Sequence, residues 1–206
     1  DWGQSWVHLG PNTKGKSINI SGQNILLGTY TQGLWISKDS GNTWNQVDLF
    51  VGEEEPIYRV ENILIIENGV FVATYGGIKR WFSSMDNGET WEREEWLDNL
   101  IVHDLMEYNN LLYLATDYSG ILVSKDFKTI FSINEELAGK TVLSLGKIGT
   151  SLFASVVNPA NQEIEIYKST NQGRNWFSTN LITVTSTQNA PIMRGIFNLN
   201  SWLFAL

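Results

Sequence analysis

Short apolar runs recur along the chain, and residues typical of turns separate them. Five runs align without gaps, at residues 25–29, 70–74, 112–116, 151–155 and 202–206. Runs this short and continuously apolar are typical of strands buried on both faces of a sheet. The fourth position of the alignment is always small, and its occupants are Gly28, Ala73, Ala115, Ala154 and Ala205. This column predicts a crowded site where neighbouring sheets approach closely.

A turn motif, Ser-x-Asp-x-Gly-x-x-Trp, recurs at the same interval. It is complete at residues 37–44 and 84–91, and residues 169–176 repeat it with Asn171 in place of Asp. A decayed copy keeps Asp126 without the Gly and the Trp, and the chain opens inside another copy. Successive copies are about 42 residues apart, which is the spacing of four-stranded propeller blades. The motif residues expected to be structural are Asp1, Asp39, Gly41, Trp44, Asp86, Gly88, Trp91, Asp126, Asn171, Gly173 and Trp176.

The chemistry of the motif predicts a hairpin turn. The Asp carboxylate accepts hydrogen bonds from backbone N–H groups within the turn. Gly supplies a positive φ, and the Trp ring folds back over the turn and buries a large apolar area. Asn171 can accept the same hydrogen bonds, so its turn is expected to form. The copy at Asp126 is not expected to keep the same geometry.

The motif resembles the Asp-box (BNR) repeat of a family of β-propellers. The resemblance implies an all-β propeller of four-stranded antiparallel blades within a single domain, residues 1–206. The blades are expected at residues 17–49, 59–94, 101–135 and 141–179, with a partial blade from residues 1–8 and 192–206. These make about five blade positions. Either the outermost strand at residues 1–8 closes a ring, or the chain is part of a larger propeller, which its ending inside an apolar strand favours.

Composition excludes several function classes. The chain has 14 Lys and Arg against 22 Asp and Glu, a formal net charge of −8, and 42% hydrophobic residues. Such content excludes general disorder, and the acidic balance argues against nucleic-acid binding. The absence of cysteine excludes disulfides and thiolate sites, and two histidines exclude a multi-histidine metal site. No cofactor, metal or membrane insertion is expected, and oligomeric state stays open.

Catalytic residues do not assemble readily from the sequence. Asp-box families include sialidases, xyloglucanase-like hydrolases, sorting receptors and assembly factors of the Ycf48 group. A sialidase presents three arginines to its substrate, and the nearest match here is Arg59, in a motif that lacks the required Pro. A glycosidase needs two carboxylates across a cleft. The loops offer acidic residues that no spacing pairs, namely Glu53, Glu54, Glu55, Asp98, Asp117, Glu135 and Glu136. His103 and Asp104 are adjacent on a strand, so their side chains diverge.

Aromatic residues give the best indication of a ligand surface. Tyr30 and Tyr75 each follow the Thr that ends an apolar strand, and Tyr118 comes one residue later on the equivalent loop. In the related families the motif turns lie away from the ligand face, which the tyrosine loops therefore form. Asp117, Trp96 and Arg59 extend this predicted surface. We expect a non-catalytic module that binds a glycan or a protein, as part of a larger extracellular or cell-envelope protein of the bacterial secreted type. The alternative is a sialidase- or xyloglucanase-like glycoside hydrolase, or a fragment of one.

Overall fold

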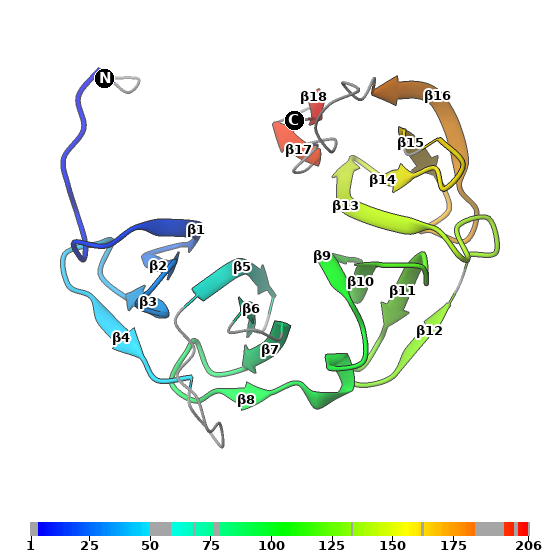
Figure 1. Cartoon of the computed structure of the whole chain (residues 1–206). Helices are drawn as coiled ribbons and strands as arrows, with labels where there is room; N and C mark the ends of the chain where they lie inside the picture. The colour runs from blue at the N-terminus through cyan, green and yellow to red at the C-terminus, as the bar shows by residue number, and fades with distance from the viewer. Residues whose placement is uncertain are drawn as a thin grey trace. The chain divides into compact units, whose positions relative to one another are not determined.

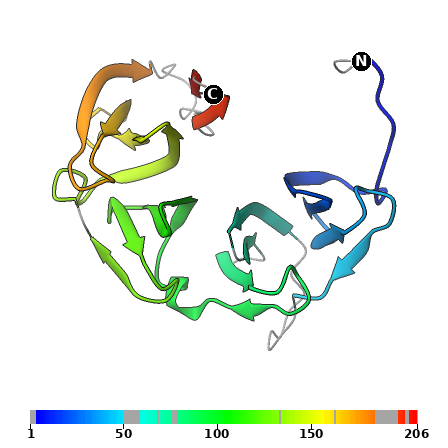
Figure 2. The same ribbon diagram turned by 180° about the vertical axis from the view of Figure 1, so that it is seen from behind.

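The structure is a computed structural model, in which the chain forms two compact units, Asp1–Asp98 and Asn99–Leu206 (Figures 1 and 2). It describes residues 4–49, 59–67, 69–75, 79–132, 134–161, 163–183, 196–199 and 202–205. Asp1, the Glu53–Glu55 triplet and Tyr58 lie outside these residues.

The first unit contains two four-stranded antiparallel sheets. The first blade has the strand order β1 (Gly15–Ser21), β2 (Asn24–Thr29), β3 (Leu34–Ser37) and β4 (Asn45–Val47). The second blade runs β5 (Arg59–Ile66), β6 (Gly69–Tyr75), β7 (Lys79–Ser84) and β8 (Glu92–Arg93), and the short 3-10 helix η1 (Glu95–Leu97) follows it. A shared core joins the two sheets, and it includes Leu26, Leu34, Ile36, Ile63, Val72 and Phe82.

The second unit repeats the same plan. The third blade consists of β9 (Val102–Tyr108), β10 (Leu111–Thr116), β11 (Ile121–Ser124) and β12 (Ile130–Ser132). The fourth consists of β13 (Thr141–Ile148), β14 (Ser151–Val157), β15 (Ile164–Ser169) and β16 (Phe177–Thr183), and β17 (Ile196–Leu199) pairs with β18 (Trp202–Ala205). The predicted all-β architecture of four-stranded antiparallel blades is confirmed. Within the described residues, no helix is long and apolar enough to cross a membrane.

The predicted outermost strand at residues 1–8 can be followed only from Gln4 onward. Residues 4–14 form no strand, and Trp6 and Val7 are exposed to solvent. A strand requires a hydrogen-bonded neighbour. Within the described part of the first unit, β1 to β4 pair only with one another.

The inner strand of every blade is bulged at the same register. The pairing shifts between Gly15 and Ser17, and equivalent shifts occur in β5, β9 and β13. A bulge leaves one extra residue unpaired and turns its side chain in a new direction. The residues so placed are Lys16, Glu61, His103 and Leu143.

The column of small residues is confirmed in three blades and wrong in the fourth. Gly28, Ala73 and Ala115 each stand fifth in their strand and pair with the residue after the bulge. In β14 that position belongs to Ser155, because Ser151 already opens the strand and leaves Ala154 fourth. Ala205 pairs with Ile196, and the residue after it lies outside the described part of the chain. A slip of one residue moves a side chain to the opposite face of the sheet.

Gly28 shows why the column must be small. A Cβ atom on this residue would lie 2.3 Å from Ser17 Oγ and 2.6 Å from Val60 Cγ1, which belongs to the next blade. The predicted close approach of neighbouring sheets therefore occurs at this position.

Candidate functional site

The motif turns are closed by hydrogen bonds between side chains and the backbone. In the first turn, Ser37 Oγ accepts the Gly41 N–H at 2.8 Å and donates to Asp39 Oδ1 at 2.9 Å. Asp39 also accepts the N–H and the hydroxyl of Thr43, at 2.8 Å and 2.6 Å. The hydroxyl of Thr43 and the other hydrogen bonds hold the pKa of Asp39 below its ordinary value of 3.8. The carboxylate is thus occupied within its own turn.

The second turn repeats this arrangement. Asp86 accepts the N–H and the hydroxyl of Thr90, and Ser84 Oγ donates to Asp86 Oδ1 at 2.7 Å. These bonds, led by the Thr90 hydroxyl, lower the pKa of Asp86. Trp44 and Trp91 each donate the indole N–H to the carbonyl of the motif Gly, at 3.0 Å and 3.2 Å.

The decayed third turn keeps the carboxylate but shortens the loop by one residue. Asp126 accepts the N–H and the hydroxyl of Thr129, both at 2.7 Å, and the backbone N–H lowers its pKa most. Phe127 has a positive φ (+58°), as do the residues directly after the Asp or Asn in the other turns, but the motif Gly with its own positive φ and the motif Trp are both missing. The changed geometry agrees with the expectation for this copy.

The fourth turn reverses the direction of one hydrogen bond. Asn171 Oδ1 still accepts the N–H of Asn175, but Asn171 Nδ2 donates to Asn175 Oδ1 at 2.8 Å. Asn175 Nδ2 in turn donates to Glu136 Oε1 at 3.1 Å, and this bond lowers the pKa of Glu136. Trp176 Nε1 donates to the Gly173 carbonyl at 2.9 Å. The Asn171–Asn175 pair closes this turn in place of the Asp–Thr pair of the other turns.

Replacing Asp86 with Ala is expected to lower the melting temperature by several degrees at about pH 7, and by less at about pH 3. The pKa of Asp86 is lowered on folding, so its stabilisation is complete above the unfolded value of 3.8 and is lost as the pH falls towards the folded pKa. Asn171→Ala is the control, because an amide does not titrate. Thermal unfolding at the two pH values checks this, and equal losses for Asp86→Ala at both would contradict it.

The tyrosine loops follow β2, β6 and β10, whereas the motif turns follow β3, β7 and β11. Because these strands are antiparallel, the two sets of loops lie at opposite ends of the blades. The Thr29 hydroxyl and the Thr116 hydroxyl each donate to a glycine carbonyl across the loop, Gly33 or Gly120, at 2.8 Å. The loops place three exposed rings, with exposed fractions of 42% for Tyr30, 44% for Tyr75 and 72% for Tyr118. The three predicted aromatic residues are therefore accessible to a ligand.

In the first unit these loops form a cluster that we call the tyrosine–arginine cluster, consisting of Lys16, Tyr30, Arg59, Glu61 and Tyr75. Arg59 Cζ is 5.4 Å from the Tyr30 ring centroid and 5.6 Å from the Tyr75 ring centroid. Arg59 is paired with Tyr75 across the β5–β6 ladder, which fixes this geometry. Arg59 Nη2 is 2.6 Å from Glu61 Oε1, and Lys16 Nζ is 5.7 Å from the Tyr30 ring centroid. The structure brings together three of the predicted binding residues, Tyr30, Arg59 and Tyr75.

Sequence reasoning missed Lys16 and Glu61, the other two members of the cluster. Both are bulge residues, and neither belongs to a recognisable motif. Lys16 lies between Gly15 and Ser17, and Glu61 lies between Val60 and Asn62, so no apolar pattern marks either position in the sequence.

Trp96, which the sequence indicated as part of the ligand surface, is held by hydrogen bonds close to its own position in the chain. Its indole N–H donates to Glu94, whose other carboxylate oxygen accepts the hydroxyl of Ser83. Glu94 is buried, and its N–H donates to the Trp81 carbonyl at 2.8 Å. These bonds link Trp96 through Glu94 to Trp81 and Ser83 of β7.

In the second unit Asp117 is a loop-capping residue. Its Oδ1 accepts the hydroxyl of Thr141 and lies 3.9 Å from His103 Nε2. Tyr118 has a φ of +59°, which is uncommon for a residue with a bulky side chain. The turn thus projects the Tyr118 ring into solvent.

The expected divergence of His103 and Asp104 is also seen. While His103 faces Asp117, Asp104 Oδ2 accepts the N–H of Leu145 from the next blade at 2.9 Å.

Asp98 Oδ2, another of the acidic candidates, forms an ion pair with Arg93 Nη2 at 2.6 Å. Within the described residues no three Asp, Glu or His side chains form a group that could hold a metal ion.

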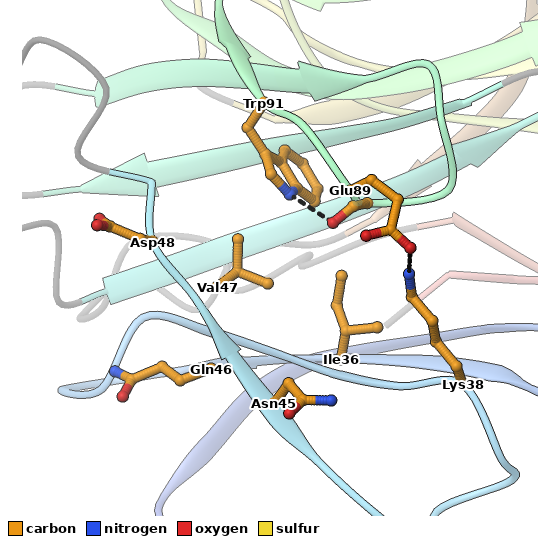
Figure 3. A pocket seen from close by; sticks show the side chains of 9 residues that line it. Ile36, Lys38, Asn45, Gln46, Val47, Asp48, Glu89 and Trp91 are labelled. Atoms are coloured by element: carbon orange, nitrogen blue, oxygen red, sulfur yellow. Dashed lines mark hydrogen bonds and ion pairs between the residues drawn. The ribbon is translucent and has the colours of Figure 1, made fainter.

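An open groove of about 510 Å³ lies between β4 and the second motif turn (Figure 3). Ile36, Val47 and Trp91 line it, and Lys38 reaches across to pair with Glu89. The groove contains none of the residues that the sequence indicated for ligand binding.

Comparison with known proteins gives matches in structure only. No family model matches the sequence, and no curated protein matches it. The GH74 xyloglucanase from Xanthomonas campestris superposes with a TM-score of 0.61 and 15% identity, over 89% of this chain and 33% of the enzyme. The extracellular domain of a putative hybrid two-component system from B. thetaiotaomicron superposes with a TM-score of 0.58 and 17% identity, over 91% of this chain and 25% of that one. YCF48 bound to D1 peptide superposes with a TM-score of 0.56 and 15% identity, over 96% of this chain and 62% of YCF48.

The chain has the fold of a β-propeller. It spans about a third of the xyloglucanase, a quarter of the B. thetaiotaomicron domain and three fifths of YCF48. Identities of 15–17% establish the fold alone.

Proposed function

We propose that the chain is a non-catalytic binding module of the Asp-box type, which recognises a glycan or a protein through its tyrosine loops. The observation that carries this proposal is the guanidinium of Arg59, which lies near two half-exposed rings, Tyr30 and Tyr75. Exposed aromatic residues beside an arginine are the residue types enriched at binding hot spots. Tyr118 and Asp117 supply a further polar and aromatic surface in the second unit.

Two comparisons support the proposal. A YCF48 propeller was solved with a bound peptide, and a neighbour from B. thetaiotaomicron is an extracellular domain. We infer an extracellular or cell-envelope location, as part of a larger protein. The motif residues Asp39, Asp86 and Asp126 have structural roles in this proposal, because each carboxylate is occupied by its own turn.

Replacing Tyr30 or Tyr75 with Ala is expected to weaken binding of the first glycan or peptide retained on an array by about 5–150-fold. Stability should change by less than about 0.5 kcal/mol, because the rings are half exposed. Phe177→Ala is the matched control, since Phe177 is an exposed ring on the outer strand β16. Calorimetric titration and thermal unfolding measure the two quantities. Unchanged affinity together with a lower melting temperature would contradict the proposal.

The alternative function is glycoside hydrolysis, which the xyloglucanase neighbour favours. Incubation with xyloglucan oligosaccharides, sialosides and β-glucosides distinguishes the two. The binding module should release no sugar above a denatured control. Turnover that survives repurification and is abolished by Asp117→Asn would favour the hydrolase.

A further inference from the structure

The tyrosine–arginine cluster carries an excess of positive charge. Its two cations, Lys16 and Arg59, are accompanied within the cluster by one carboxylate, Glu61. The chain as a whole has a formal net charge of −8, so this local excess opposes the overall charge. Positive charge at an exposed site attracts an anionic ligand, and the acidic remainder of the protein's surface repels the same ligand elsewhere.

The two tyrosine rings stay accessible beside the cations. Lys16 Nζ lies over the Tyr30 ring at 5.7 Å from its centroid, and Arg59 Cζ lies over the same ring at 5.4 Å. These distances are within the range of cation–π contacts. Tyr30 is nevertheless 42% exposed and Tyr75 is 44% exposed, so a ligand can contact the open part of either ring and have a cation beside it.

A sugar ring with a carboxylate at its edge has this shape. In a hexuronate the carboxylate projects from C5 outward from the pyranose ring, while the C–H groups form an apolar face. Tyrosine provides an apolar ring and a hydroxyl for such a face. A guanidinium has five N–H donors, and Glu61 pairs with one terminal nitrogen of Arg59, so donors remain for a ligand carboxylate.

We propose that the tyrosine–arginine cluster recognises a hexuronate residue of an acidic polysaccharide. Tyr30 and Tyr75 provide the stacking surfaces, and Arg59 and Lys16 pair with the carboxylate. This inference rests on the proposed binding function and names the ligand class for the same site.

The test compares two ligands with the same sugar backbone, one charged and one neutral. Polygalacturonate and its methyl ester share a backbone, but the ester lacks the carboxylate. The full chain should bind polygalacturonate about tenfold more tightly than the ester, since charge-assisted hydrogen bonds are about twice as strong as neutral ones. Lys16→Gln and Arg59→Gln should each remove most of this difference between the acid and the ester. Lys16 is exposed, so its variant tests the site even where Arg59→Gln disturbs folding.

Lys147→Gln is the matched control. Lys147 Nζ is 5.5 Å from the Tyr108 ring centroid, so this pair has the same residue types and a similar distance in the second unit. It should bind both polysaccharides like the wild type.

Three results would overturn the inference. Equal affinity for the acid and the ester would show that charge is not recognised, and the proposed function would stand. Binding of polyglutamate in place of polygalacturonate would identify an acidic protein as the ligand. Failure to bind either polysaccharide, with no effect of Tyr30→Ala on any ligand, would overturn the proposed function as well.

Discussion

Replacing Trp176 with Ala is expected to lower the free energy of unfolding by about 3–5 kcal/mol, the range for removing a buried Trp side chain. Trp176 is 2% exposed and packs with Leu137, Leu145 and Leu152 in the core of the second unit. Its indole N–H also donates to Gly173. The variant loses this hydrogen bond and leaves a cavity that the surrounding strands cannot fill. Urea denaturation followed by circular dichroism measures the loss.

The other motif tryptophans are internal controls for this experiment. All three indoles donate to the carbonyl of the motif glycine, at 2.9–3.2 Å, but Trp91 is 6% exposed and Trp44 is only partly buried. If burial dominates, the losses should fall in the order Trp176, Trp91, Trp44. Equal losses in the three variants would instead identify the shared hydrogen bond as the main contribution.

Gly120→Ala is expected to destabilise the protein by about 2–4 kcal/mol, from left-handed backbone strain and a steric clash. Gly120 has a φ of +69°, and an added Cβ would lie 2.4 Å from the carbonyl oxygen of Leu137. Because this neighbour is backbone, no rotamer change relieves the clash. The segment before β13 must shift, although the Gly120 N–H donates to the Lys140 carbonyl at 3.1 Å.

Gly139→Ala separates the two contributions. Gly139 has a φ of +75°, and a Cβ there would meet no atom within 4 Å. This variant should lose only about 1–2 kcal/mol, the cost of the left-handed conformation. Thermal and urea unfolding of both variants measure the difference. A loss for Gly139→Ala as large as that for Gly120→Ala would show that the clash is relieved elsewhere.

The arrangement of strands could be predicted because the turn motif has a chemical signature. The motif at residues 37–44 begins on the last residue of β3 and ends just before β4, and the motif at residues 84–91 lies in the same way between β7 and β8. The register of the apolar strand was harder to predict. The run at residues 151–155 aligned with the others by hydrophobicity, but its hairpin turn places Ser155 rather than Ala154 in the column. Apolar character does not distinguish adjacent positions when both faces of the sheet are buried.

The candidate site could be predicted only in part. The sequence indicated Tyr30, Tyr75 and Arg59 separately, from loop position and from a partial motif. That Arg59 lies near both rings depends on its pairing with Tyr75 and on the approach of two blades. The bulges that place Lys16 and Glu61 leave no pattern in a single sequence, since a bulge changes the register without changing residue types. The binding role of these residues stays a prediction.

The reversed hydrogen bond in the fourth turn means that its two polar residues cannot be exchanged singly for those of the other repeats. Changing Asn171 to Asp would restore the consensus but would bring a carboxylate against the Asn175 carbonyl oxygen, which needs a donor. Turning the Asn175 amide around would supply that donor, but it would point the Asn175 carbonyl oxygen at the Glu136 carboxylate. The residues at positions 171 and 175 therefore have to be changed as a pair and not one at a time. A consensus design of this turn should introduce Asp and Thr together.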